Sequence, residues 1–256
     1  MLQAHSFLWN YLWVAPNVLL LILAFLWWKR GYGEQLPSFF AFAIFSAIGD
    51  LAVFWADVSP SVSALDFWCV AWASLLIESL LKFIVIGAIF AHILRPYASI
   101  SRVGRRLTSG FGAVLVLLAT LAAASSRGDS TVRLISGLHL VEQTVFIIEM
   151  GLVLFLFLFA AYFHLSWDRL SFGVLLGFGI SACAHLVGWA ISANAEPSAY
   201  GRTLLDFFGM AVHHLCVLIW FYYVLVPHRV TTKSPVPLPE NNLAVWNREL
   251  ERLLQQ

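Results

Sequence analysis

Residues 65–94 read LDFWCVAWASLLIESLLKFIVIGAIFAHIL, and this stretch decides the fold class. It is longer than the roughly 20 apolar residues that an α-helix needs to cross a hydrocarbon core of ~30 Å. Its apolar residues are continuous, without the alternation that is typical of a membrane β-barrel strand. The stretch therefore predicts a transmembrane helix, with Glu78 and Lys82 inside the membrane.

The composition of the whole chain indicates the same class. Its 256 residues are 61% hydrophobic and 11% charged, with a mean hydropathy of +0.83, whereas soluble domains have about 25% charged residues. The expected partner is the lipid bilayer, and a formal net charge of +1 gives no reason to expect a nucleic-acid partner. The three cysteines lie in apolar runs without metal-binding spacing, which indicates small buried residues.

Six further apolar runs are separated by segments rich in Gly, Pro, Ser or charge. The sequence thus predicts an all-α, polytopic membrane protein with seven transmembrane helices, over roughly 8–28, 38–57, 65–94, 110–126, 134–163, 171–193 and 203–226. The predicted organisation is a transmembrane domain over 1–228, a Pro-rich linker over 229–241 and an amphipathic helix over 242–256.

The basic residues predict the orientation of the helices, because cytoplasmic loops carry an excess of Lys and Arg. Eleven basic residues fall on one predicted side: Lys29, Arg30, Arg95, Arg102, Arg105, Arg106, Arg169, Arg229, Lys233, Arg248 and Arg252. Three fall on the other: Arg127, Arg133 and Arg202. We therefore expect a multi-pass protein of the inner (plasma) membrane, with its N-terminus outside and its C-terminus in the cytoplasm.

The end of the chain, LAVWNRELERLLQQ over 243–256, has a helical apolar stripe made by Leu243, Trp246, Leu250 and Leu253. The predicted helix lies on the lipid interface or the inner face of the bundle, or it docks a cytoplasmic partner or a second copy of the chain.

Ionisable residues inside the predicted spans form the candidate site. At a rise of 1.5 Å per residue, Asp50 and Lys82 lie about 18 Å above the cytoplasmic ends of their spans, and Glu78 about 24 Å. Glu149, His185 and His213 lie at roughly 20–21 Å. Charged groups at this depth are costly and mark functional sites in membrane proteins. The sequence therefore predicts one polar layer, which either binds a ligand or senses protons, or joins the helices through hydrogen bonds.

The stretch FFGMAVHHLCVLIWFYY, residues 207–223, places two of the histidines side by side. Neighbours on a helix point about 100° apart, so we expect one of His213 and His214 to face the bundle axis and the other to lie at a helix–helix contact. Gly173, Gly177 and Ser181 form a stripe of small residues that predicts a close helix contact. His185 continues this stripe and should face protein.

Several functions are compatible with this layer. A receptor-like or sensory protein would use histidine as a switch near neutral pH. Histidines on adjacent spans, His185 with His213 or His214, can ligate a b-type haem. His185, His213 and an acid can hold zinc for hydrolysis, and a proton-coupled carrier would use the acids as a relay. The chain has no Walker, serine-elbow, HExxH or dinucleotide motif, so the sequence favours a sensory membrane protein over an enzyme.

Two stretches carry a resemblance. GLVLFLFLFAAYFHLSWDRLSFGVLLGFGI, followed by the terminal LAVWNRELERLL, resembles an uncharacterised family of bacterial seven-helix integral membrane proteins. The resemblance covers the carboxyl-terminal half and implies that the terminal helix belongs with the bundle. It implies no catalytic residue.

Overall fold

A computed structural model describes residues 5–93, 110, 130–162, 168–195, 198–226, 248 and 252. Its helices are α1 (Phe7–Lys29), α2 (Pro37–Val58), α3 (Ala64–Ile93), α5 (Ser130–Tyr162), α6 (Arg169–Ala195) and α7 (Ala199–Leu225). These described residues contain no strand, and all six helices are long and apolar enough to cross a membrane. The described residues are thus all-α, as predicted, and their six apolar helices indicate a multi-pass membrane protein. Apart from Gly110, Arg248 and Arg252, the predicted fourth span and terminal helix lie outside the described residues.

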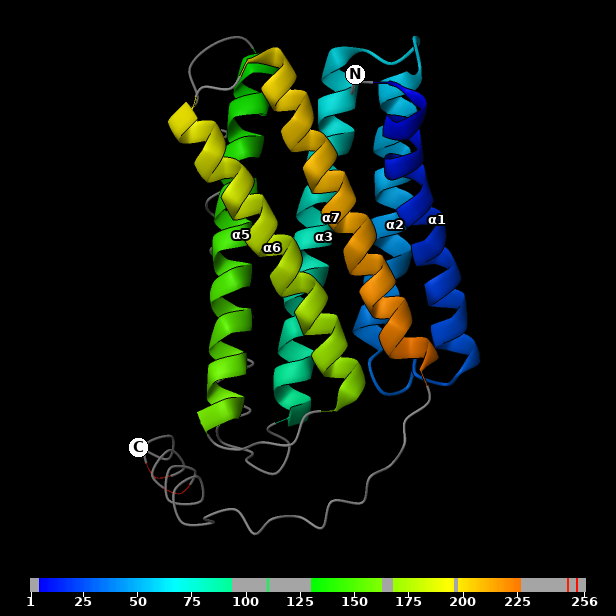
Figure 1. Ribbon diagram of the computed structural model, residues 1–256, viewed down its shortest axis with the longest axis vertical. Helices are drawn as coiled ribbons and strands as arrows, with labels where there is room; N and C mark the ends of the chain where they lie inside the picture. Colours follow the sequence, from blue (N-terminus) through cyan, green and yellow to red (C-terminus); the bar gives the residue numbers. More distant parts are fainter. Residues whose placement is uncertain are drawn as a thin grey trace.

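The six helices pack side by side as a ring (Figure 1). Each helix contacts two neighbours, in the order α1, α2, α3, α5, α6, α7 and back to α1. Aromatic pairs show that α1 and α2 are antiparallel. The ring centroids of Trp27 on α1 and Phe39 on α2 lie 4.7 Å apart, and those of Trp13 and Phe54 lie 5.4 Å apart. We call the end at which α1, α3, α5 and α7 begin the upper end, as in Figure 1, and the opposite end the lower end.

Hydrogen bonds at the ends of α1 and α7 begin one helix and join three of them. The Ser6 hydroxyl accepts a hydrogen bond from the Trp9 N–H and so begins α1. Gly31 follows the helix with a φ of 74°, a conformation that favours glycine. The last carbonyls of α7 accept hydrogen bonds from the Arg30 guanidinium, while Arg169 donates to the Val226 carbonyl at 3.2 Å. These contacts tie α1, α6 and α7 together at the lower end.

α6 and α7 approach closely where the sequence predicts a small-residue contact. A Cβ on Gly173 would collide with the Tyr223 ring, and a Cβ on Gly177 would collide with the Trp220 indole. The Trp220 indole N–H donates to the Val174 carbonyl at 3.3 Å, and the Cys216 thiol donates to the Gly177 carbonyl at 3.3 Å. The predicted close contact along this stripe is confirmed.

The apolar core occupies the lower half of the ring. It comprises Leu20, Leu23, Ala24, Trp27, Leu36, Phe39, Phe42, Ala43, Ala47, Val85, Ile86, Ile89, Phe90, Ile93, Val153, Leu156, Val174, Leu175, Phe178, Cys216, Val217, Trp220 and Val224. On every helix these residues lie on the lower-end side of the predicted polar layer. A smaller cluster, formed by Phe83, Val141 and Val145, packs α3 against α5 nearer the upper end.

Candidate functional site

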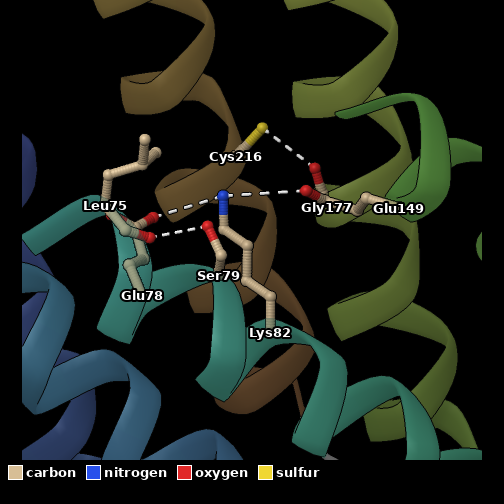
Figure 2. Close-up of polar contacts among 7 residues, drawn as sticks. All are labelled: Leu75, Glu78, Ser79, Lys82, Glu149, Gly177 and Cys216. Carbon is tan, nitrogen blue, oxygen red and sulfur yellow. Dashed lines mark hydrogen bonds and ion pairs between the residues drawn. The ribbon is translucent and has the colours of Figure 1, made fainter. Parts of the chain in front are cut away.

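Lys82 is the centre of the polar layer. Its ammonium Nζ lies 3.2 Å from Oε1 of Glu78, one turn earlier on α3, and 3.8 Å from Oε2 of Glu149 on α5. Figure 2 shows the Lys82 side chain reaching between the two carboxylates. The residue is only 8% exposed although most of α3 is apolar. Lys82 is therefore a buried charge whose burial depends on its acidic neighbours.

Glu149 is the most deeply buried acid of the layer. Its side chain is 0% exposed, and neither carboxylate oxygen has a hydrogen-bond partner. Its ion pair with Lys82 at 3.8 Å is too long for a hydrogen bond. Burying a carboxylate without hydrogen bonds costs free energy. Glu149 is therefore the electrostatically least stable member of the layer.

His185 of α6 joins the layer through an aromatic contact. Its imidazole stacks on the Phe146 ring with centroids 4.0 Å apart and planes 9° apart. Phe146 also lies 5.3 Å from Nζ of Lys82. Phe146 precedes Glu149 by one turn on the same face of α5, so the stack places the His185 ring beside the Lys82–Glu149 pair.

His213 and Asp50 complete the set predicted from the sequence. His213 lies close enough to Glu78, Lys82 and His185 for their charges to interact, and its Nε2 is buried without a hydrogen-bond partner. Asp50 of α2 interacts in the same way with Glu78 and Lys82. The structure therefore brings Asp50, Glu78, Lys82, Glu149, His185 and His213 into one layer, from five helices.

The two adjacent histidines have different neighbours. The His214 ring lies 6.0 Å from the ring of Tyr11 on α1, and its Nδ1 is buried without a hydrogen-bond partner. His213 instead interacts with the ionisable groups of α3 and α6. One histidine thus belongs to the layer and the other to the contact between α1 and α7, which is the division of roles that the helical geometry predicts.

Asn17 of α1 is a member of the layer that the sequence analysis missed. It is 1% exposed, its amide lies within interaction range of Asp50, and it donates a hydrogen bond to the Trp13 carbonyl at 2.8 Å. The signal in the sequence is an amide directly after Pro16 in an apolar run, and this side chain is polar without being ionisable. With Asn17, each of the six described helices contributes a polar group to the layer.

The acids of the layer outnumber its fixed positive charge. Asp50, Glu78 and Glu149 are three carboxyl groups, and Lys82 is the one ammonium that the described helices place among them. If all four were ionised, two negative charges would remain unbalanced in low-dielectric surroundings, where each costs several kcal/mol. The arrangement can therefore take up positive charge, and a proton is the positive charge that needs least room.

A metal ion fits the described residues less well. Among them, no three His, Cys, Asp or Glu side chains are grouped closely enough to hold one. His185, His213 and His214 are the metal candidates from the sequence, but His214 turns toward Tyr11 of α1, while His185 stacks flat on Phe146.

No family model, curated protein or solved structure matches this chain.

Proposed function

We propose that the protein is a sensory membrane protein that takes up protons through its buried layer of carboxyl groups. The observation that carries this proposal is the convergence of three carboxyl groups on the ammonium of Lys82, with Glu149 buried and lacking hydrogen bonds. A proton on one of these groups would relieve the surplus negative charge without any added volume.

The proposed output is a change in the contact between α3 and α5. Lys82 on α3 attracts Glu149 on α5 only while the carboxylate is charged. A proton on Glu149 removes this attraction, so Lys82 is left with Glu78 of its own helix, which is already the nearer acid at 3.2 Å. Proton uptake would thus loosen one link between two helices, which is the kind of local event that a sensor transmits.

A carrier would need access to the layer from both ends of the bundle. The apolar core occupies the lower half of the ring on every described helix, and this filling favours a sensor over a transporter. Haem and zinc remain alternatives that an absorption spectrum and an elemental analysis of the purified protein would test.

The proposal includes seven spans with the upper end of the bundle outside the cell. Phe90 of α3 contacts Phe155 and Phe159 of α5, and the smaller apolar cluster joins the two helices nearer the upper end, so α3 and α5 run in the same direction. α3 thus ends at the lower end and α5 begins at the upper end, which supports a further span at 110–126. The predicted excess of basic residues on the side of Lys29, Arg30 and Arg169 supports a cytoplasmic assignment of the lower end and an inner-membrane location.

Proton uptake can be tested on the protein in detergent by infrared difference spectroscopy between about pH 8 and pH 5, the range in which histidine-linked sensors respond. Wild-type protein should gain the carbonyl band of protonated buried carboxyl groups on acidification. Glu149→Gln removes the central acid and should reduce this band. The matched control is Glu34→Gln, which makes the same chemical change at an exposed position between α1 and α2.

The proposal is wrong if wild-type protein shows no such band. It is equally wrong if the band is undiminished in each of Asp50→Asn, Glu78→Gln and Glu149→Gln.

A further inference from the structure

The two halves of the ring on either side of the polar layer differ in what fills them. Below the layer, the apolar core is continuous around the ring and begins within about one turn of Asn17 on α1 and of His213 on α7. Above the layer, few of the side chains that the structure describes are buried and apolar, and this part of the ring carries further ionisable groups, including Glu142 and Asp206. Apolar packing of this density excludes water, so the layer is shielded from the lower end.

Three side chains connect the upper end with the layer. Asp206 of α7 is exposed, and its carboxylate interacts electrostatically with Glu142 of α5. Glu142 in turn interacts with His185 of α6. His185 interacts with Glu78 and Lys82 in the layer itself. Asp206, Glu142 and His185 therefore form a series of titratable groups whose charges interact, from the exposed Asp206 to the layer.

The stack of His185 on Phe146 fixes the height of the imidazole. Glu142, Phe146 and Glu149 lie on one face of α5, with Phe146 one turn below Glu142 and one turn above Glu149. Because the His185 ring lies flat against Phe146 at 4.0 Å, it is held between the heights of the two carboxyl groups. An imidazole can accept a proton on one nitrogen and release another from the second nitrogen, so this position suits a transfer step.

We propose that protons enter the layer from the upper end, and that Asp206, Glu142 and His185 pass them to the carboxyl groups beside Lys82. This inference rests on the proposed function. In each step one proton moves from a carboxyl group or an imidazolium to the next acceptor, and no other bond forms or breaks. The charged or titratable groups that face His185 are Glu142 from α5, Glu78 and Lys82 from α3, and His213 from α7.

The route is tested by releasing protons with a light pulse on one side of vesicles that contain the full chain in a uniform orientation. The carbonyl band of protonated carboxyl groups, followed by time-resolved infrared absorption, reports their arrival. In wild-type protein the band should rise at least roughly tenfold faster when protons are released at the upper end, because a positioned proton-transfer group typically contributes about a hundredfold or more.

Variants of the route should change the rate at which the band rises. His185→Asn, Glu142→Gln and Asp206→Asn are each expected to slow the rise from the upper end by roughly tenfold or more. His92→Asn is the matched control for the histidine, because His92 is exposed in the last turn of α3 at the lower end. Glu34→Gln is the control for the acids.

Equal rates from both sides would overturn the route, as would wild-type rates in His185→Asn and Glu142→Gln. Asp206→Asn alters an exposed side chain and keeps the test open if a buried variant fails to fold. A wild-type protein without any pH-dependent band would contradict the proposed function instead, so the two failures are distinguishable.

Discussion

Lys82 shows at the scale of one residue why the layer has to be considered as a unit. Its ammonium is buried beside Glu78 and Glu149, and the cost of burying any one of these charges is offset only by the others. Removal of the single cation leaves the acids uncompensated, whereas removal of one acid leaves Lys82 with a partner. The two kinds of change should therefore differ in their effect on stability.

We predict that Lys82→Met lowers the free energy of unfolding by about 3–5 kcal/mol, the usual cost of breaking a buried ion pair from one side. Thermal unfolding in detergent, followed by circular dichroism, measures the effect. Lys29→Met is the control, because Lys29 is exposed at the end of α1. Addition of Glu149→Gln to Lys82→Met should restore part of the loss, since the double variant no longer buries that unpaired acid. Equal unfolding temperatures for Lys82→Met and Lys29→Met would contradict the prediction.

At the scale of the helices, the contact between α6 and α7 depends on positions that have no side chain. The Trp220 indole occupies the space beside Gly177 and is held there by its hydrogen bond to the Val174 carbonyl and by edge contacts with Phe39 and Phe178. A ring held from three sides cannot move away at low cost. Gly177 is therefore required by the close approach of the indole.

Gly177→Ala should destabilise the protein by about 1–3 kcal/mol, as overpacking of a dense core does. Gly188→Ala is the matched control on the same helix, because no atom lies within 4 Å of the Cβ that it would add. Alanine at that position should be neutral or stabilising by up to about 1 kcal/mol, the difference in helix propensity. The comparison is made by unfolding temperature in one detergent, and a Gly177→Ala protein as stable as Gly188→Ala would count against the packing account.

Helix positions could be predicted from the sequence because single residues mark where the apolar runs end. The predicted span 38–57 corresponds to α2 (Pro37–Val58), with Pro37 at its start, and 171–193 corresponds to α6 (Arg169–Ala195), which follows Asp168. The contact between Phe146 and His185 could not be predicted, since it depends on which helices are neighbours and on their rotation. Asn17 was missed for a related reason, because an amide carries no charge and its role depends on Asp50 across the contact.

At the scale of the whole molecule, the ring places a polar layer between halves that differ in packing. Hydropathy alone does not predict this difference, because α1, α2 and α6 are similarly apolar by mean hydropathy. The difference arises from which side chains face the interior, and that depends on the packing of all six described helices. The orientation of the bundle in the membrane decides which side supplies the protons that reach the layer. This orientation therefore links the structure to the proposed sensor.

The orientation can be measured with single cysteines at opposite ends of the ring. Glu34 is exposed between α1 and α2 at the lower end, and Ser61 is exposed between α2 and α3 at the upper end. Cys69 and Cys183 are exposed, contrary to the prediction that the cysteines are buried, so both are changed to Ser in the background. A membrane-impermeant thiol reagent added to intact cells should then label Ser61→Cys and leave Glu34→Cys unlabelled. The excess of basic residues on the Glu34 side predicts this result. Permeabilised cells control for reactivity, because both cysteines should then be labelled. The opposite pattern in intact cells would place the upper end in the cytoplasm, and the layer would then respond to protons from inside the cell.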